Sequence, residues 1–306
     1  MYLKEIKKIL GFDIIGNAEE QVKGITFACC AEDDDIAIID VQGQATTTKA
    51  KVLLVNRMLL GTGKTVVLCN CPVYKAADEI ARLLVRLGEY EDYKVQPEYI
   101  LQPGHYLLGK NTVVGQGTSI GALTTIGSGV YIGQKCYISE HVYIAAGSYI
   151  GDNVVIRPGA RIASPAFFRY DKYPANDFVG YGKVVIENNV TIGVNTIIQR
   201  GSFSDTFIGQ GTGIGDGVVI GHDVKIGRAC RIVSQAGIAG NVVLEDGVEV
   251  LGQAGIAENI RVGSEAVIKA KSLVSKNVPE CEVISGLYGR KHTDELRLQA
   301  KLRTIL

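Results

Sequence analysis

Tryptophan is absent from this 306-residue sequence and methionine occurs only twice, whereas glycine occurs 37 times. A chain without tryptophan and rich in glycine is unusual among mixed globular domains, and it indicates a repetitive architecture with many turns. Neither sign of charge dominates, because 32 Lys and Arg residues balance 32 Asp and Glu residues. The bulk charge therefore predicts no nucleic-acid partner and no binding to an anionic membrane surface.

Long apolar segments are also missing, since no run approaches the roughly 20 residues that a transmembrane helix needs. Residues 1–12, MYLKEIKKILGF, lack the apolar stretch and the small-residue cleavage site of a secretory signal. Seven cysteines, an odd number that includes the adjacent Cys29 and Cys30, do not make a disulfide framework. We therefore expect a reduced, cytoplasmic protein without a transmembrane segment.

Motifs for metals and phosphates are incomplete. Cys69 and Cys71 are separated by one residue and have no second ligand pair, which is poor spacing for zinc. Residues 61–65, GTGKT, resemble the end of a phosphate-binding loop, but Met58 and Leu59 stand where that loop requires glycine. We predict no metal site and interpret residues 61–65 as an ordinary turn.

A six-residue repeat fills most of the remaining sequence. From Leu108 to Ile162, every sixth residue is aliphatic in ten consecutive repeats, and a small residue usually follows it. The phase returns at Ile186 and, after an insertion at residues 202–205, continues from Ile208 to Val274. This period matches neither an α-helix nor the alternation of a strand, so each repeat must be a larger unit.

A short strand and a tight corner together use about six residues, and three such units close one triangular coil. The aliphatic residue points into the prism and stacks on its equivalents, while small residues allow the backbone to turn. We therefore predict a mainly β fold, a left-handed parallel β-helix from about Leu108 to Val274, in which each coil contacts its neighbours. The left hand follows from what hexapeptide repeats are known to form, because spacing alone leaves the hand open.

Two interruptions of the period are candidate functional segments, because loops on a rigid scaffold often carry the site. The longer, residues 163–183, brings aromatic and basic side chains together at Phe167, Phe168, Arg169 and Tyr170. Its ordinary interpretation is a loop that packs its own aromatic rings on the prism or on a neighbouring subunit. The shorter is the SFSD segment at residues 202–205.

The two ends of the chain lack the six-residue phase. Residues 1–98 read as a small α/β domain, with helices at 1–10 and 76–87 and strands at 36–40, 51–56 and 65–70. Residues 99–283 form the β-helix domain, and 284–306 form a tail whose residues 294–306 read as a basic amphipathic helix. That helix either caps the prism or packs in an oligomer, or it binds an acidic partner through Arg297, Lys301 and Arg303.

His222 is the best candidate for a catalytic group among four histidines, although a lone histidine is more often structural. It lies two places after the inward-facing Ile220, in an outward position of VVIGHDVKIG. A neutral imidazole is the side chain best suited to take a proton from an amine or a hydroxyl near neutral pH.

Residues 192–227, IGVNTIIQRGSFSDTFIGQGTGIGDGVVIGHDVKIG, resemble the UDP-3-O-acylglucosamine N-acyltransferases of lipid A biosynthesis (LpxD) nearly residue for residue. SQAGIAG at 234–240, GQAGIA at 252–257 and ISG at 284–286 are similar to further phrases of that family. The N-terminal domain resembles the family more loosely, and NCPVYKAADEIARLL at 70–84 is its best match.

The resemblance implies a homotrimer with active sites in the clefts between β-helices. It places His222 on the base that takes a proton as the 2-amine of a UDP-3-O-acylglucosamine attacks a 3-hydroxyacyl thioester. The thioester belongs to acyl carrier protein, whose phosphopantetheine arm supplies the acyl group, so no permanently bound cofactor is expected. The C-terminal helix would contact the carrier protein, and residues 1–98 would help to bind the nucleotide.

Several positions depart from the family pattern. Gln199 replaces an aspartate, Gly215 and Asp216 replace an Asp-Asn pair, and Asn259 replaces a second histidine. The carboxylate that orients the base is therefore displaced or lost, and the identities of the nucleotide and the acyl chain stay open. The candidate substrate-binding residues are Phe167, Phe168, Arg169, Tyr170, Gln199, Asp216 and Asn259.

Two other functions remain compatible with the sequence. One is another sugar-nucleotide N-acyl- or N-acetyltransferase that uses acyl coenzyme A, which the departures at Gln199, Gly215 and Asn259 favour. The other is a non-catalytic β-helix scaffold, which would tolerate the loss of His222. The amphipathic tail favours the carrier-protein donor, because coenzyme A needs no protein-binding helix.

Overall fold

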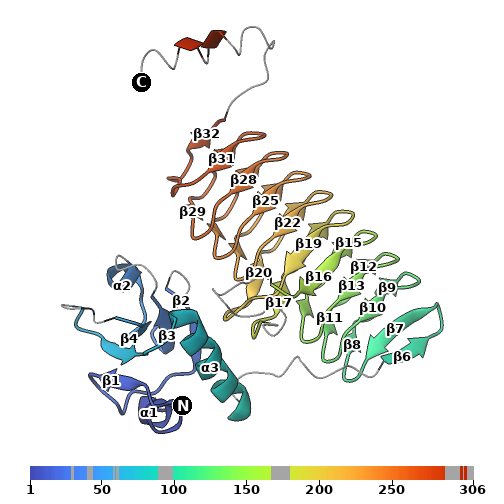
Figure 1. Cartoon of the computed structure of the whole chain (residues 1–306). Coiled ribbons are helices and arrows are strands. Elements are labelled where there is room, and N and C mark those ends of the chain that lie inside the picture. Colours follow the sequence, from blue (N-terminus) through green and yellow to red (C-terminus); the bar gives the residue numbers. More distant parts are fainter. Residues whose placement is uncertain are drawn as a thin grey trace.

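The chain folds into a small α/β domain and a long β-helix, as a computed structural model shows (Figure 1). The fold class predicted from the six-residue period is confirmed, a left-handed parallel β-helix whose faces are three parallel sheets. The structure describes residues 1–28, 31–39, 44–57, 59, 62–88, 99–166, 180–286, 297–298 and 300–301.

The N-terminal domain is built on one five-stranded sheet in the order β1-β5-β4-β3-β2. Strands β2 to β5 are parallel, and β1 is antiparallel to β5. The strands are β1 (Asp13–Ile15), β2 (Gly24–Phe27), β3 (Asp35–Ile38), β4 (Val52–Val55) and β5 (Thr65–Leu68). The helices are α1 (Leu3–Leu10), α2 (Gln44–Thr47) and α3 (Val73–Arg86). The sequence prediction missed β1, β2 and α2 because each has four residues or fewer, too short to show a period.

The β-helix has three faces, and apart from the antiparallel hairpin of β6 and β7 each strand pairs in parallel with the strand one coil away. The first face contains β6 (Tyr99–Gln102), β7 (Tyr106–Gly109), β10 (Thr125–Ile126), β13 (Tyr143–Ile144), β16 (Arg161–Ser164), β19 (Ile197–Gln199), β22 (Val219–Ile220), β25 (Gly237–Ile238), β28 (Gly255–Ile256) and β31 (Leu273–Val274). The second contains β8 (Val113–Val114), β11 (Tyr131–Ile132), β14 (Tyr149–Ile150), β17 (Val184–Ile186), β20 (Thr206–Ile208), β23 (Lys225–Ile226), β26 (Val243–Leu244) and β29 (Arg261–Val262). The third contains β9 (Ser119–Ile120), β12 (Tyr137–Ile138), β15 (Val155–Ile156), β18 (Thr191–Ile192), β21 (Gly213–Ile214), β24 (Arg231–Ile232), β27 (Glu249–Val250), β30 (Val267–Ile268) and β32 (Val283–Ile284).

The aliphatic residue of each repeat forms the core of the prism, as predicted. From Ile126 to Val274 these side chains are buried, and they pack in one continuous cluster. Leu108 and Ile120, in the first coils, are partly buried and pack against it. Each coil therefore covers the apolar surface of the coil before it, which is how a solenoid is stabilised.

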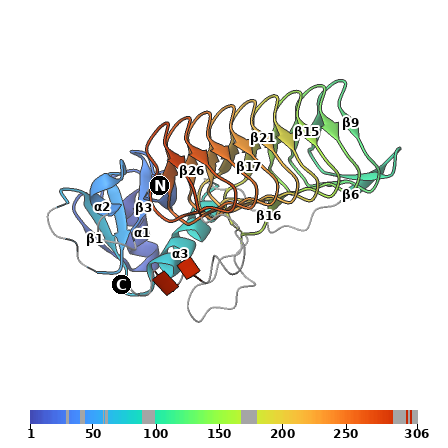
Figure 2. The same ribbon diagram turned by 90° about the horizontal axis from the view of Figure 1, so that it is seen from above.

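The N-terminal domain packs against the side of the β-helix at the coils that carry β17 and β20, as two views show (Figures 1 and 2). Phe203, from the 202–205 interruption, is buried in the core cluster of the N-terminal domain. Nearby, the Tyr181 hydroxyl donates a hydrogen bond to Asp78 of α3. The described parts of both interruptions thus lie at the junction of the two domains.

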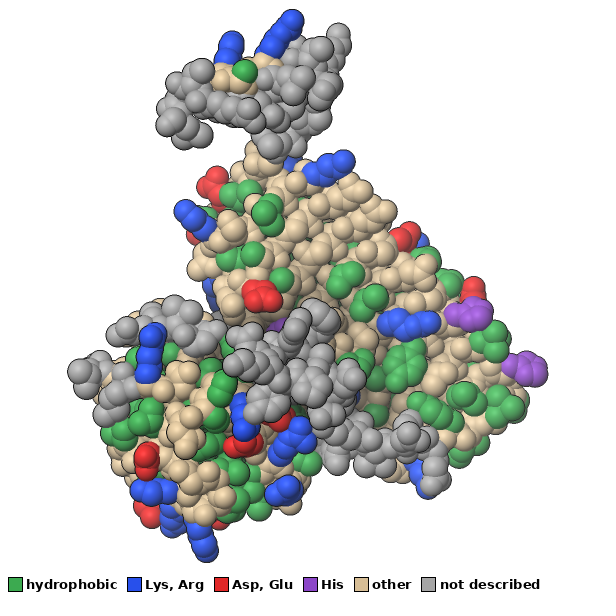
Figure 3. Space-filling model, in the orientation of Figure 1, with side chains coloured by type: hydrophobic (Ala, Val, Ile, Leu, Met, Phe, Trp, Pro, Cys, Tyr) green, Lys and Arg blue, Asp and Glu red, His purple; other side chains and the backbone are tan. Residues whose placement is uncertain are grey.

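The described part of the tail extends beyond the last coil (Figure 1). Arg297 and Lys301 are helical and exposed. No helix in the described part of the chain combines the length and the apolar character needed to cross a bilayer. Charged side chains of both signs are scattered over the face shown in Figure 3, which agrees with the balanced composition.

Candidate active site

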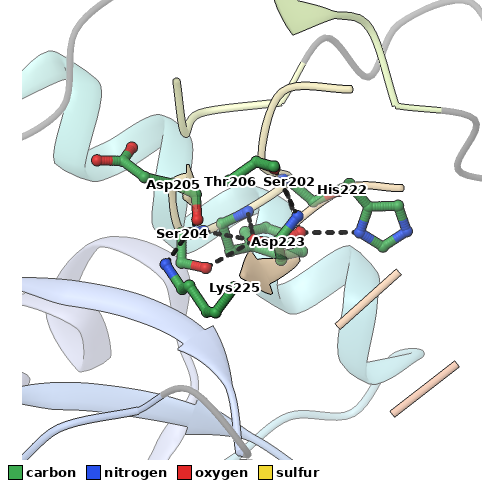
Figure 4. A network of polar contacts seen from close by, with 8 residues as sticks. Ser202, Ser204, Asp205, Thr206, His222, Asp223 and Lys225 are labelled. Carbon is green, nitrogen blue, oxygen red and sulfur yellow. Dashed lines mark hydrogen bonds and ion pairs between the residues drawn. The ribbon is translucent and has the colours of Figure 1, made fainter. Parts of the chain in front are cut away.

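His222 lies at the corner of the prism that follows β22, and its imidazole is 6% exposed. Its Nδ1 atom is 2.8 Å from Oδ2 of Asp223, the next residue in the chain (Figure 4). Adjacent side chains do not usually meet in this way. Here Asp223 has a φ of 59°, in the left-handed region, which turns the backbone sharply between the two residues.

Asp223 is completely buried and accepts several hydrogen bonds from the SFSD interruption. Its Oδ1 atom accepts the backbone N–H groups of Phe203 at 3.1 Å and Ser204 at 2.7 Å, and the Ser204 hydroxyl at 2.9 Å. Its Oδ2 atom accepts the Ser202 N–H at 2.8 Å, besides its contact with His222. The interruption predicted as functional therefore forms a cradle for the carboxylate beside the base.

The charge of Asp223 determines which nitrogen of His222 carries a proton. Burial alone would raise the pKa of the Asp223 carboxyl, but the hydrogen bond and attraction from His222, together with the N–H groups of Ser204 and Ser202, hold that pKa below its usual value. An ionised carboxylate can only accept hydrogen bonds, so Nδ1 of His222 is the donor. The lone pair of the neutral imidazole is then on Nε2.

The Nε2 side of the imidazole lies over the backbone of the next coil. A Cβ atom on Gly240 would lie 2.6 Å from both Nε2 and Cε1 of His222, closer than any real Cβ contact. The ring of Phe27, at the end of β2, lies 6.0 Å from the imidazole centroid. The imidazole is therefore held between the two domains, and glycine is required at position 240.

The other predicted site residues divide into three groups. Gln199 ends β19, which pairs with β22, so it lies one coil from Gly221 on the face that carries the base. Asp216 follows β21 on the third face, where its Oδ1 accepts the Val194 N–H at 2.7 Å. Within one chain Asp216 is therefore on a different face from His222, and the carboxylate that contacts the imidazole is that of Asp223. The loop residues Phe167, Phe168, Arg169 and Tyr170, the tail residue Arg303 and the pair Cys29 and Cys30 lie outside the described residues.

Asn259 lines a cavity of about 640 Å³ between the N-terminal domain and the second face of the prism. Its backbone N–H donates to Gly240, and that of Asn241 donates to His222, so the cavity wall is continuous with the backbone of the base. The charged and amide side chains that line the cavity are Glu32, Gln44 and Lys49 of the N-terminal domain and Lys225, Asn241, Asn259, Arg261 and Asn277 of the β-helix.

Sequence reasoning missed Asp223, Lys49 and Lys225. For Asp223 a local signal existed, because an acidic residue directly after the candidate base at a corner is a potential partner for its imidazole. For Lys49 and Lys225 no local signal existed, since they come together through domain docking. Among the residues that the structure describes, no cluster of His, Cys, Asp and Glu side chains could hold a metal ion.

Known proteins share the repeats of the β-helix. The bacterial transferase hexapeptide pattern (six repeats) matches residues 111–146, 129–164 and 205–240. A UDP-3-O-acylglucosamine N-acyltransferase of Rhizobium meliloti (strain 1021) is 43% identical over 156 residues, which cover 50% of this chain and 44% of the relative. One from Methylobacterium nodulans is 39% identical over 131 residues, or 42% and 37% of the two chains.

A solved structure is also similar to the β-helix. The UDP-N-acetylglucosamine acyltransferase of Francisella novicida is 28% identical, with a TM-score of 0.52 over 63% of this chain and 73% of that one. The chain spans less than half the length of the curated relatives that it matches. Its β-helix is therefore similar to the bacterial transferase hexapeptide repeats and to part of these UDP-3-O-acylglucosamine N-acyltransferases.

Proposed function

We propose that this protein transfers a 3-hydroxyacyl chain from acyl carrier protein to the 2-amine of a UDP-3-O-acylglucosamine, with His222 as the general base. The observation that carries the proposal is the bond between Nδ1 of His222 and a buried carboxylate, which leaves the lone pair on Nε2. The chain's relatives are named for this N-acyl transfer, and the donor and the base are inferred from the site and from the sequence resemblance.

The proposed reaction needs one group that first accepts a proton and then donates it. Nε2 of His222 takes a proton as the amine nitrogen attacks the thioester carbonyl, so that the C–N bond forms. When the C–S bond then breaks, the same proton passes from His222 to the departing thiolate of the phosphopantetheine arm. Asp223 holds the imidazole in the required tautomer and stabilises the imidazolium between these steps. No permanently bound cofactor has a role in this chemistry.

The cavity between the domains is the proposed site for the nucleotide sugar. Three cations, Lys49, Lys225 and Arg261, outnumber the one carboxylate of the lining, Glu32, which pairs with Lys49, so the net positive charge suits a diphosphate. Asn241 and Asn259 add amides that can donate to and accept from a sugar or a base. A volume of about 640 Å³ lies within the range of small-molecule and cofactor sites.

Two partners complete the proposal. A homotrimer would set the third face of one prism, with Asp216, against a neighbouring copy and so bring the separated candidate residues to one cleft. Acyl carrier protein, an acidic partner, would contact the tail through the exposed Arg297 and Lys301. Phe167, Phe168, Arg169, Tyr170, Gln199 and Arg303 remain candidate binding residues in this proposal.

A mass-spectrometric transfer assay tests the function. Wild type, His222→Ala and His141→Ala are each offered 3-hydroxyacyl carrier protein with UDP-3-O-acylglucosamine, and separately acetyl coenzyme A with UDP-amino sugars. His141 is a matched control, because it is an exposed corner histidine on an earlier coil. We expect transfer of the long acyl chain by wild type and by His141→Ala, and a loss of about 10²- to 10⁴-fold in His222→Ala.

The other outcomes point to other functions. Acetyl transfer that depends on His222, without transfer of the long chain, would make the protein a sugar-nucleotide N-acetyltransferase. Transfer that survives in His222→Ala would remove the base from the mechanism. Absence of both reactions in wild type would favour a scaffold.

A further inference from the structure

We propose that Phe203 is a positioning residue for the base: the N-terminal domain holds the Phe203 side chain, and so aligns the backbone that orients Asp223 and His222. The kinetic part of this inference rests on the proposed function, whereas its structural part does not. On this proposal, the His222 imidazole is correctly oriented only when the N-terminal domain is docked. This role is separate from any part that the domain has in binding substrate.

The backbone of residues 202–204 forms one half of the link. Its three consecutive N–H groups all point at the Asp223 carboxylate, at 2.8, 3.1 and 2.7 Å. The segment is tightly wound, because a Cβ atom on Gly201 would lie 1.4 Å from the carbonyl oxygen of Ser204. A tight turn of this kind moves as a unit, so a displacement at Phe203 shifts all three donors together.

The side chain of Phe203 forms the other half. It is 3% exposed and belongs to the hydrophobic core of the N-terminal domain. Its ring lies 5.7 Å from the ring of Phe27 in an edge-on arrangement and 6.2 Å from that of Tyr181 in a stacked one. Such aromatic pairs have preferred geometries, so the domain sets the position of the ring as well as burying it.

Phe27 closes the arrangement into a triangle, since its ring packs on both Phe203 and the His222 imidazole. The next residue, Ala28, lines the cavity between the domains. Both domains contribute to the wall of that cavity, so a nucleotide in it binds the docked arrangement better than a separated one. Occupancy of the cavity would therefore favour the oriented base.

Two kinds of measurement test the proposal on the full-length protein. The first compares kcat and KM of Phe203→Ala, Phe203→Leu and Phe12→Ala. Phe12 is a matched control, because it is a buried phenylalanine of the same core that makes no contact with Asp223. The second is nitrogen NMR of protein with isotope-labelled histidine, in which the four histidines report their tautomers separately.

We expect Phe203→Ala to lower kcat by about 10- to 100-fold, because a displaced base loses its alignment, while KM changes by less than about threefold. Phe203→Leu should recover most of the rate by refilling the space, and Phe12→Ala should keep the wild-type kcat. The His222 signal should be a single Nδ1–H form in wild type and Phe12→Ala, and a mixture of tautomers in Phe203→Ala. Added UDP should increase the fraction of the Nδ1–H tautomer of His222 in Phe203→Ala.

Ser204→Ala keeps the test decisive if Phe203→Ala fails to fold. It removes the hydroxyl bond to Asp223 without touching the N-terminal domain, so it should shift the His222 tautomers in the same direction. A single Nδ1–H form and a wild-type kcat in folded Phe203→Ala, or in Ser204→Ala where Phe203→Ala does not fold, would overturn the proposal. If wild type shows no acyl transfer, the proposed function fails, and the histidine spectra still decide whether Phe203 orients His222.

Discussion

At the residue scale, the site depends on a corner that brings two consecutive side chains together. His222 and Asp223 are neighbours in sequence, yet one imidazole nitrogen meets a buried carboxylate because the backbone turns left-handed between them. The carboxylate has no solvent, so donors from residues 202–204 replace water and keep it charged. The rigidity of the pair comes from this enclosure.

Asp223→Asn should abolish most of the activity while leaving the β-helix folded. An asparagine amide that donates to Nδ1 would move the imidazole proton to Nε2, the nitrogen that must accept a proton, so we expect kcat to fall by about 10²- to 10⁴-fold. The steady-state transfer assay measures this. Asp152→Asn is the matched control, because Asp152 also accepts a backbone N–H at a corner but is only partly buried. Equal losses in both variants would count against a specific role for Asp223.

Gly240→Ala should disable the base sterically. The added methyl group would occupy the space 2.6 Å from Nε2, and the imidazole would have to swing away. We expect kcat to fall by about 10²-fold, because a displacement near 1 Å has effects of that size. At Gly252 an added Cβ meets only ordinary contacts, so Gly252→Ala should keep the wild-type rate in the same assay. A fully active Gly240→Ala would show that the imidazole works from another position.

At the element scale, most strands of the prism have only two or three residues and depend on the neighbouring coils. Corner threonines supply part of the connection between coils. The Thr212 hydroxyl donates to the carbonyl of Gly227 and accepts the N–H of Cys230, both on the next coil. Thr118 makes the same pair of bonds to Gly133 and Cys136, but it is only partly buried.

Thr212→Val should destabilise the protein by about 1–3 kcal/mol, because it leaves a buried carbonyl and a buried N–H without partners. Thr212→Ser keeps the hydroxyl, so its loss of unfolding free energy should be less than about half of that in Thr212→Val. Thr118→Val should cost less than Thr212→Val, since Thr118 is only partly buried whereas Thr212 is fully buried. Chemical denaturation followed by circular dichroism provides the comparison, and equal losses at the two sites would contradict the account.

At the scale of the whole molecule, docking of the N-terminal domain creates both the cavity and the environment of the base. Lys49 and Lys225 are 176 positions apart in the numbering, yet both line one cavity. The base lies beside Phe27 for the same reason. A nucleotide that bridges the two domains would therefore be held by charges that neither domain provides alone.

Lys49→Gln should weaken binding of UDP by about tenfold, the equivalent of about 1.4 kcal/mol, because one cation near the diphosphate is lost. Isothermal titration calorimetry measures the effect, which should decrease in high salt. Lys51→Gln is the matched control, because Lys51 is two residues away and pairs with Asp33 as Lys49 pairs with Glu32, but it does not line the cavity. An unchanged Kd in Lys49→Gln would place the nucleotide elsewhere.

The β-helix could be predicted from the amino-acid sequence alone, because each repeat contacts only the adjacent coils and its inward residue recurs at a constant interval. Ile208 to Val274 could be placed in the core by counting, and the outward position of His222 followed from the same count. The sequence also marked residues 202–205 as a departure from the period.

Only the tertiary structure decided what that departure does. Docking places Phe203 in another domain's core, and the left-handed corner turns Asp223 toward the base, whereas Asp216 ends on a different face. The positions of these side chains depend on contacts between residues far apart in the chain. They also depend on local backbone turns that do not follow the six-residue repeat. A repeat can therefore be read from its spacing, while the orientation of a catalytic pair depends on how the domains pack.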